Sequence, residues 1–507
     1  MGRRTVAALA TAMALLCVSG DLRVSGQGQA TPALQVVRDA AAAMGGEARI
    51  LAVKTLTIEG YATNPNIGQA MTPEAEPLWW MIPDYKRTID LVNGRMALTM
   101  SRRPAFPAVF DAGPGRGGAA GAGARGGGQP NPQAIRTGRI DMLQHPLTLV
   151  RAALDPAARV TNLRQSGSQK SVDITTAQGD TLTLTVDALK RPVSVRTAVY
   201  HANLGDTERV TTWDAWEELD GVRLPKRIIT RLDRWVEYDI GVMKDTLDAD
   251  LSELAGTPAL LVQPPAQTAA PNPPNLPVAE VAKGIWFVTG GGIPCVIVEF
   301  ADHVALVEVG GGDARVQALV AKAKELVPGK PVTQAIVSHH HFDHTAGLRA
   351  AVAEGLTIIT HRVNEAWFRE AVARKHTIVV DALARSPKPL KIVVFDDSYS
   401  IKDASMEVTL YHLVNSTHGD GILAAYFPRE RVYAEPDVWN PGAQIQPHIQ
   451  NLWADITRRK LQIDRVIPLH GTAVQPFSEL EKTYAEWANQ KATKTTYVPP
   501  GLQQPQP

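Results

Sequence analysis

The stretch SHHHFDH, residues 338–344, decides the fold of this chain, and it follows directly on the apolar run AIV at 335–337. The apolar run predicts a buried strand, so the histidines lie on the loop at its carboxyl end, where α/β sheets bind ligands. In an extended loop, residues two apart point the same way, so His339 and His341 can converge on one point. The stretch therefore predicts a ligand site at a sheet edge.

The next two polar residues, Asp343 and His344, follow after a turn and can face a second point nearby. Neutral imidazole and carboxylate groups suit divalent zinc, although iron and manganese accept the same ligands. Histidine clusters also occur in low-complexity metal-binding tracts and as surface accidents, so the motif alone leaves that alternative open. The rest of the chain has to decide between the two interpretations.

Three further ligand candidates stand downstream, each at the end of a predicted strand. His418 follows the predicted strand 406–414, Asp437 follows a short apolar run, and His470 ends the run Val466-Ile467-Pro468-Leu469. A rigid sheet can fix loop residues of this kind in position. These candidates favour a metal centre over an isolated histidine tract.

The order H-x-H-x-D-H, histidine, acidic residue, histidine resembles that of the metallo-β-lactamase superfamily over about residues 278–490. The resemblance implies an α/β fold of the αββα sandwich type, with two metal sites at one edge of the sheets. It also implies two Zn²⁺ ions as cofactors, with iron or manganese as alternatives. Site one would be held by His339, His341 and His418, and site two by Asp343, His344 and His470, with Asp437 bridging the ions.

One departure from the family pattern concerns the bridging position, where Glu435-Pro436-Asp437 replaces the usual Gly-Asp pair. Asp437 has the better register, and Glu435 stays open as an alternative. His340 points to the opposite face and is predicted to be a supporting or structural residue. His361 and Asn364 follow the next predicted strand, 356–360. They either line the pocket or cap a helix.

The remaining histidines have no partner at a ligand spacing, and we expect them to be ordinary surface or core residues. They are His145, His201, His303, His376, His412 and His448.

The resemblance implies a dinuclear zinc hydrolase that uses a metal-bridging hydroxide on an ester, lactone, thioester or related small-molecule substrate, and the amino-terminal segment described below adds the expectation of export. Asp343 and Asp437 would be its catalytic residues, and no Gly-x-Ser-x-Gly elbow competes with them. A bridging Asp437 and an added amino-terminal domain disfavour a β-lactamase. Two alternatives stay open: an oxidoreductase with one iron, like sulfur dioxygenases, and an apolar-ligand binding protein with a vestigial metal domain.

Composition sets limits on location and partners. The chain has 507 residues, 44% of them hydrophobic, and a formal net charge of +1, so charge gives no reason to expect nucleic-acid binding. Residues 1–30 resemble a signal peptide, with Arg3-Arg4 before an apolar run too short for a stable membrane span. We therefore expect a periplasmic or secreted protein. Leu16 before Cys17 disfavours a lipoprotein. The oligomeric state is not encoded in any recognisable pattern.

The chain divides into two predicted domains. Residues 31–256 alternate like an antiparallel β domain, interrupted at 112–133 by a Gly-rich segment predicted to be disordered. A Pro-rich linker, 257–277, leads to the domain at 278–490, and 491–507 form a tail. The first domain weakly resembles the curved sheet of lipoprotein carriers, although no motif supports this. Its tryptophans either pack a core or line an apolar concavity: Trp79, Trp80, Trp213, Trp216 and Trp235.

Overall fold

The computed structural model describes residues 31–105, 132–250, 252–254, 256–261 and 274–494. The predicted signal peptide, most of the predicted disordered segment and parts of the linker and tail lie outside these residues. Two predicted boundaries are wrong. Helix α3 (Pro132–Met142) begins within the segment expected to be disordered, and helix α11 (Phe477–Lys494) continues into the expected tail.

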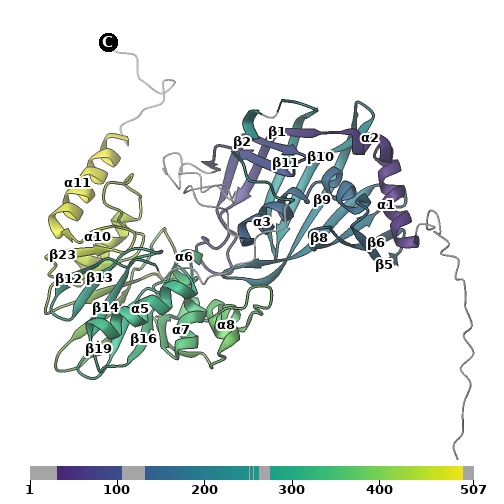
Figure 1. Ribbon diagram of the computed structural model, residues 1–507. Coiled ribbons are helices and arrows are strands. Elements are labelled where there is room, and N and C mark those ends of the chain that lie inside the picture. The colour runs from purple at the N-terminus through teal and green to yellow at the C-terminus, as the bar shows by residue number, and fades with distance from the viewer. Residues whose placement is uncertain (1–30, 106–131, 251, 255, 262–273, 495–507) are drawn as a thin grey trace, which may run out of the picture.

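The amino-terminal part is one mostly antiparallel sheet, as the alternation predicts. It has eleven strands in the order β3-β2-β1-β11-β10-β9-β8-β7-β6-β5, with β4 paired to β2, and it curves around the helices in Figure 1. The strands are β1 (Thr55–Pro65), β2 (Trp79–Asp90), β3 (Arg95–Thr99), β4 (Arg103–Pro104), β5 (Arg159–Ser166), β6 (Gln169–Thr175), β7 (Thr181–Val186), β8 (Pro192–His201), β9 (Gly205–Leu219), β10 (Val222–Leu232) and β11 (Trp235–Leu247).

Every second side chain along the strands is buried, and these side chains form the inner face of the sheet. On neighbouring strands β6 and β7, Val172 lies opposite Leu184 and Ile174 opposite Leu182, and all four are buried. Helices α1 (Pro32–Ala43), α2 (Glu47–Ala52) and α4 (Pro146–Leu154) contribute apolar residues to the same core. The sheet therefore buries one face against its own helices.

The carboxyl-terminal part contains two further sheets. The seven-stranded sheet runs in chain order through β12 (Val278–Ala282), β13 (Ile285–Val288), β14 (Cys295–Glu299), β15 (Val304–Val307), β16 (Val332–Ile336), β17 (Thr357–His361) and β18 (Lys391–Phe395). The six-stranded sheet runs through β19 (Ser398–Lys402), β20 (Glu407–His412), β21 (Leu423–Phe427), β22 (Val432–Glu435), β23 (Arg465–Pro468) and β24 (Gln475–Pro476). The pairings from β15 to β18 and between β22 and β23 are parallel.

These two sheets pack face to face with helices on their outer faces. Phe287, Ile336 and Phe427 belong to the apolar layer between the sheets. Helices α5 (Asp313–Leu326), α7 (Leu348–Glu354) and α8 (Glu365–Ala373) cover the seven-stranded sheet, and α10 (Ile449–Arg459) and α11 cover the other. No helix among the described residues is long and apolar enough to cross a membrane.

The two parts meet at the short helix α6 (Phe342–Thr345), which Figure 1 shows at their junction. The Phe342 amide donates to the Gly68 carbonyl in the β1–β2 loop at 3.2 Å, and Asn203 Nδ2 donates to the Phe342 carbonyl at 3.0 Å. The Phe342 ring packs on Trp367 and Trp235. The middle of the histidine motif is thus also a contact between the two parts.

Candidate metal centre

All seven predicted ligand residues come together at one edge of the carboxyl-terminal sheets. They form two groups, and within each group one donor atom per residue lies within 4.8 Å of the others. The first group is His339, His341, His418 and Asp437, and the second is Asp343, His344, Asp437 and His470.

Strand ends position these residues. The motif begins just after β16, Asp437 follows β22 and His470 follows β23. Because β22 and β23 run parallel, their carboxyl ends reach the same edge. His418 lies on the loop between β20 and β21. The fold therefore gathers residues from distant parts of the sequence at one point.

The nitrogens in the centre face one another in a way that fits shared cations. His341 Nδ1 lies 3.0 Å from His418 Nε2, and His344 Nε2 lies 3.1 Å from His470 Nε2. His339 Nε2 is buried without a hydrogen-bond partner, 3.4 Å from Asp437 Oδ2. A buried nitrogen without a partner is costly, and a divalent ion among imidazole and carboxylate donors removes that cost. The residues present therefore fit divalent metal ions.

Electrostatics divide the centre into two kinds of histidine. Burial and the neighbouring imidazoles hold the pKa of His339 well below its ordinary value, which favours the neutral form that a metal ligand needs. Burial also disfavours a charged His344, yet Glu308, Asp437 and Asp343 hold its pKa well above the ordinary value. The second group is thus rich in negative charge, which favours cation binding.

The ring nitrogens that face away from the centre also have partners. Ser338 Oγ lies 2.8 Å from His339 Nδ1, and Glu308 Oε2 lies 3.1 Å from His344 Nδ1, as an ion pair without good hydrogen-bond alignment. Partners of this kind fix which nitrogen faces a metal. Sequence reasoning missed Glu308, and its position directly after β15, at the same sheet edge, was the available signal.

The amino-terminal part supplies further partners through the β1–β2 loop. The Ala70 carbonyl oxygen lies 3.0 Å from His341 Nε2 and 2.9 Å from His340 Nε2. Gln69 Nε2 donates to Asp343 Oδ1 at 2.8 Å. No sequence signal connected this loop with the motif, because 274 residues separate Gln69 from Asp343.

Two residues of the centre have a left-handed backbone, which is uncommon outside glycine. Asp437 has a φ of 57°, and Glu308 has a φ of 79°. Strain of this kind concentrates at functional sites, where the surrounding structure enforces it.

The alternative bridging residue, Glu435, belongs to neither group of donors. It is fully buried, and its Oε2 accepts from the Val438 and Trp439 amides at 2.9 and 3.1 Å. Burial raises the pKa of Glu435 well above its ordinary value. Glu435 therefore holds the turn that carries Asp437.

His361 and Asn364 take the capping and bracing role rather than a place in the centre. His361 Nδ1 accepts from the Val363 amide at 3.3 Å, and Asn364 Nδ2 donates to the Gly421 carbonyl at 3.2 Å. Among the histidines expected to be ordinary, His448 lies unexpectedly close to the centre, with its ring 5.4 Å from the His418 ring. Its burial next to His418 lowers its pKa to about 3, so it is neutral.

The family comparison agrees with this geometry. Residues 288–433 match the family model of the metallo-beta-lactamase superfamily. This part of the chain is similar to the metallo-β-lactamase superfamily. The matched residues include the motif and His418, and they end before Asp437 and His470.

Solved metallo-β-lactamases align with less than half of this chain. The enzyme from Pontibacter korlensis is 17% identical over 43% of this chain and 100% of its own, with a TM-score of 0.33. The enzyme from Hirschia baltica is 16% identical over 41% and 96%, with a TM-score of 0.32. FIM-1 from Pseudomonas aeruginosa, in its mono-zinc form, is 15% identical over 43% and 96%, with a TM-score of 0.33. No curated protein matches the chain.

Replacing Gln69 by alanine is expected to weaken metal binding at this centre. The substitution removes the donor to Asp343, and losing such a supporting hydrogen bond typically costs about 10–100-fold in metal affinity. Competition with a chromophoric chelator measures the affinity. Gln165→Ala is the matched control, because Gln165 lies on the exposed strand β5 and its side chain donates to the nearby Gly167 carbonyl. Equal affinities in the two variants would contradict a role for Gln69.

Proposed function

We propose that the protein is a dinuclear metal-dependent hydrolase, with zinc as the metal and an ester, lactone or thioester as the substrate. The observation that carries the proposal is the convergence of seven donor residues in two groups that share Asp437. Superfamily members are metal-dependent hydrolases, and this chain keeps a complete set of donors. Site one would use His339, His341 and His418, and site two would use Asp343, His344 and His470.

Bound divalent ions supply Lewis acidity and an activated water nucleophile at neutral pH. The chain's own residues orient that chemistry. Asp437 Oδ2 lies 2.6 Å from His344 Nε2 in the second group and 3.4 Å from both His339 Nε2 and His418 Nε2 in the first, so its carboxylate connects the two groups. Asp343 is held through Oδ1 by Gln69, which fixes the direction of its second oxygen.

Exposure indicates the side from which a substrate reaches the centre. The side chains of His339 and His344 are 0% exposed, whereas those of Asp343 and His470 are 39% and 27% exposed. The most exposed donors are thus Asp343 and His470 of the second group, while His418 of the first group is 18% exposed. We propose that the substrate enters beside Asp343 and His470. We also propose export, on the basis of the amino-terminal segment.

Metal analysis followed by a substrate panel tests this function. We expect about two zinc ions per chain, as in two-metal hydrolases, and turnover of at least one lactone, ester or thioester. His339→Ala is expected to lose both turnover and metal. One iron per chain with oxygen uptake would overturn the proposal in favour of an oxidoreductase. Full turnover by His339→Ala would refute the site itself.

A further inference from the structure

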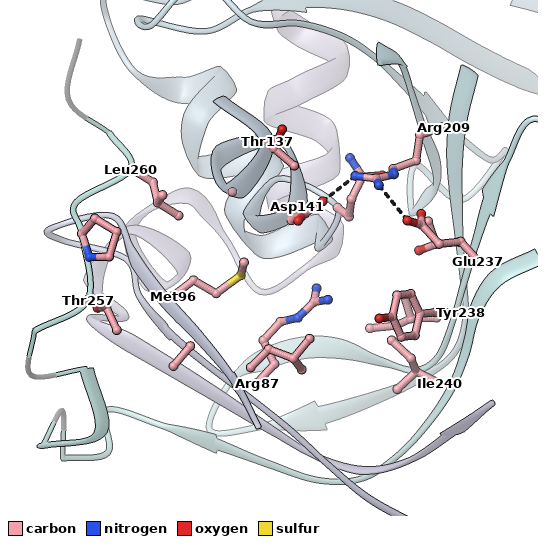
Figure 2. Close-up of a pocket in the computed structure, with 17 residues that line it drawn as sticks. Arg87, Met96, Thr137, Asp141, Arg209, Glu237, Tyr238, Ile240, Thr257 and Leu260 are labelled. Atoms are coloured by element: carbon pink, nitrogen blue, oxygen red, sulfur yellow. Dashed lines mark hydrogen bonds and ion pairs between the residues drawn. The ribbon is translucent and has the colours of Figure 1, made fainter. Parts of the chain in front are cut away.

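A cavity lies inside the curved amino-terminal sheet, separate from the metal centre. It has a volume of about 570 Å³, within the usual range of roughly 300–1,000 Å³ for small-molecule sites. Figure 2 shows its lining, with Arg87 projecting into the interior. None of the tryptophans that the sequence suggested for an apolar concavity lines it. The apolar wall is Met96, Leu98, Ile228, Ile240 and Leu260.

Arg87 is on the inner face because of the strand period. Successive side chains of a strand alternate between faces, and Tyr85 and Ile89, two residues to either side, are buried in the core. The cross-strand neighbours of Arg87 are Ile58 and Leu98, which carry no charge. The register therefore places a cation among apolar residues with no acidic residue directly opposite.

The Arg87 charge has no ion-pair partner among the described residues. Its Nε is buried without a hydrogen-bond partner, and its guanidinium lies 5.7 Å from the Tyr85 ring centre. A guanidinium cannot lose its proton to escape this cost. The side chain is half-buried and its Nε is shielded from solvent, so this partly desolvated charge without an ionic partner favours an anionic ligand.

A second donor without a partner faces the same space. Tyr238 is 8% exposed, and its hydroxyl has no hydrogen-bond partner. Burial raises the pKa of Tyr238 to about 12, so the hydroxyl keeps its proton and can donate it. In Figure 2, Tyr238 lies across the interior from Met96 and beside Arg87.

The neighbouring charges limit the ligand to a single negative charge. Arg209 is already neutralised, because it forms ion pairs with both Asp141 and Glu237 (Figure 2). These two carboxylates also line the cavity and would repel a doubly charged phosphate. The lining thus carries two guanidiniums and two carboxylates, which disfavours a dianion, and a singly charged carboxylate matches the guanidinium fork of Arg87.

We propose that this cavity binds an amphiphilic carboxylate, with its head group on Arg87 and Tyr238 and its alkyl chain along the apolar wall. This binding function is independent of hydrolysis at the metal centre. The proposed site differs from a purely apolar concavity, because Arg87 and Tyr238 would distinguish ligands by their head group.

Decanoate and decanol are the matched probes, since they share a chain and differ in the head group. We expect the wild-type protein to bind decanoate at least tenfold more tightly than decanol by calorimetry. Arg87→Met should weaken decanoate binding roughly tenfold or more, since it removes a charged hydrogen bond, and should leave decanol within twofold. Equal affinities of the wild type for the two probes would overturn the proposal, even if Arg87→Met fails to fold.

Two controls exclude other sources of carboxylate binding. Arg227→Met removes a positive charge from the outer side of the same sheet, where Arg227 pairs with Asp239, and it should leave decanoate binding unchanged. His339→Ala should also leave it unchanged. A decanoate affinity that depended on His339 and not on Arg87 would place the carboxylate at the metal centre and refute the cavity site.

Discussion

Asp437→Asn is expected to reduce kcat/KM roughly a thousandfold or more, equivalent to about 4 kcal/mol of transition-state stabilisation. The amide keeps the size of the side chain and loses the charge that both groups of donors share. With one negative charge fewer between them, two cations would repel each other more strongly. The number of metal ions per chain should therefore fall together with turnover of the best substrate of the panel.

Glu435→Gln is the matched control for this prediction. Its amide oxygen can still accept from the Val438 and Trp439 amides, and its neutral side chain resembles the protonated form that burial favours. We expect metal content and turnover close to those of the parent protein. The reverse result, with metal lost from Glu435→Gln and kept in Asp437→Asn, would make Glu435 the bridging residue.

Gly68→Ala is expected to destabilise the contact between the two parts of the chain and to lower metal retention. Gly68 has a φ of +78°, and a Cβ atom there would lie 2.1 Å from the Phe342 ring. A left-handed alanine costs about 1 kcal/mol, and overpacking adds roughly 2 kcal/mol. Because Phe342 lies between His341 and Asp343 in the chain, its displacement also disturbs the donor residues.

The control is Gly179→Ala, in the turn between β6 and β7. Gly179 has a similar φ of +86°, and no atom lies within 4 Å of the position that a Cβ would take. Urea unfolding should show a loss of only about 1 kcal/mol, with metal retention unchanged after dialysis against a chelator. If the two variants lost the same stability and retained the same metal, the Phe342 contact would have no role in holding the centre.

The convergence of the seven residues could be predicted largely because its signals are local. His339, His341, Asp343 and His344 lie within one loop, and the strand before each later donor was visible as an apolar run. Alternation likewise predicted the antiparallel sheet. Whether the seven residues act as ligands is still a prediction, since proximity alone does not establish coordination.

The supporting residues could not be predicted, because their contacts are long-range. Gln69 and Ala70 lie on a loop without any motif, and only the docking of the two parts brings them to Asp343 and His341. Helix α3 was missed because it begins at the end of a Gly-rich segment. The sequence did not indicate that Arg87 lines a cavity. That became clear only from the strand register, which places Arg87 on the inner face of the sheet.

The Ala70 carbonyl has a wider thermodynamic consequence. It contacts both His340 and His341. The position of the donor His341 therefore depends on how the amino-terminal sheet packs against the carboxyl-terminal part. If a cation binds more tightly when the two parts are packed together, its binding must stabilise that packing by the same free energy. Removing bound ions would thus weaken the contact between the two parts, and weakening that contact would lower the affinity for the ions.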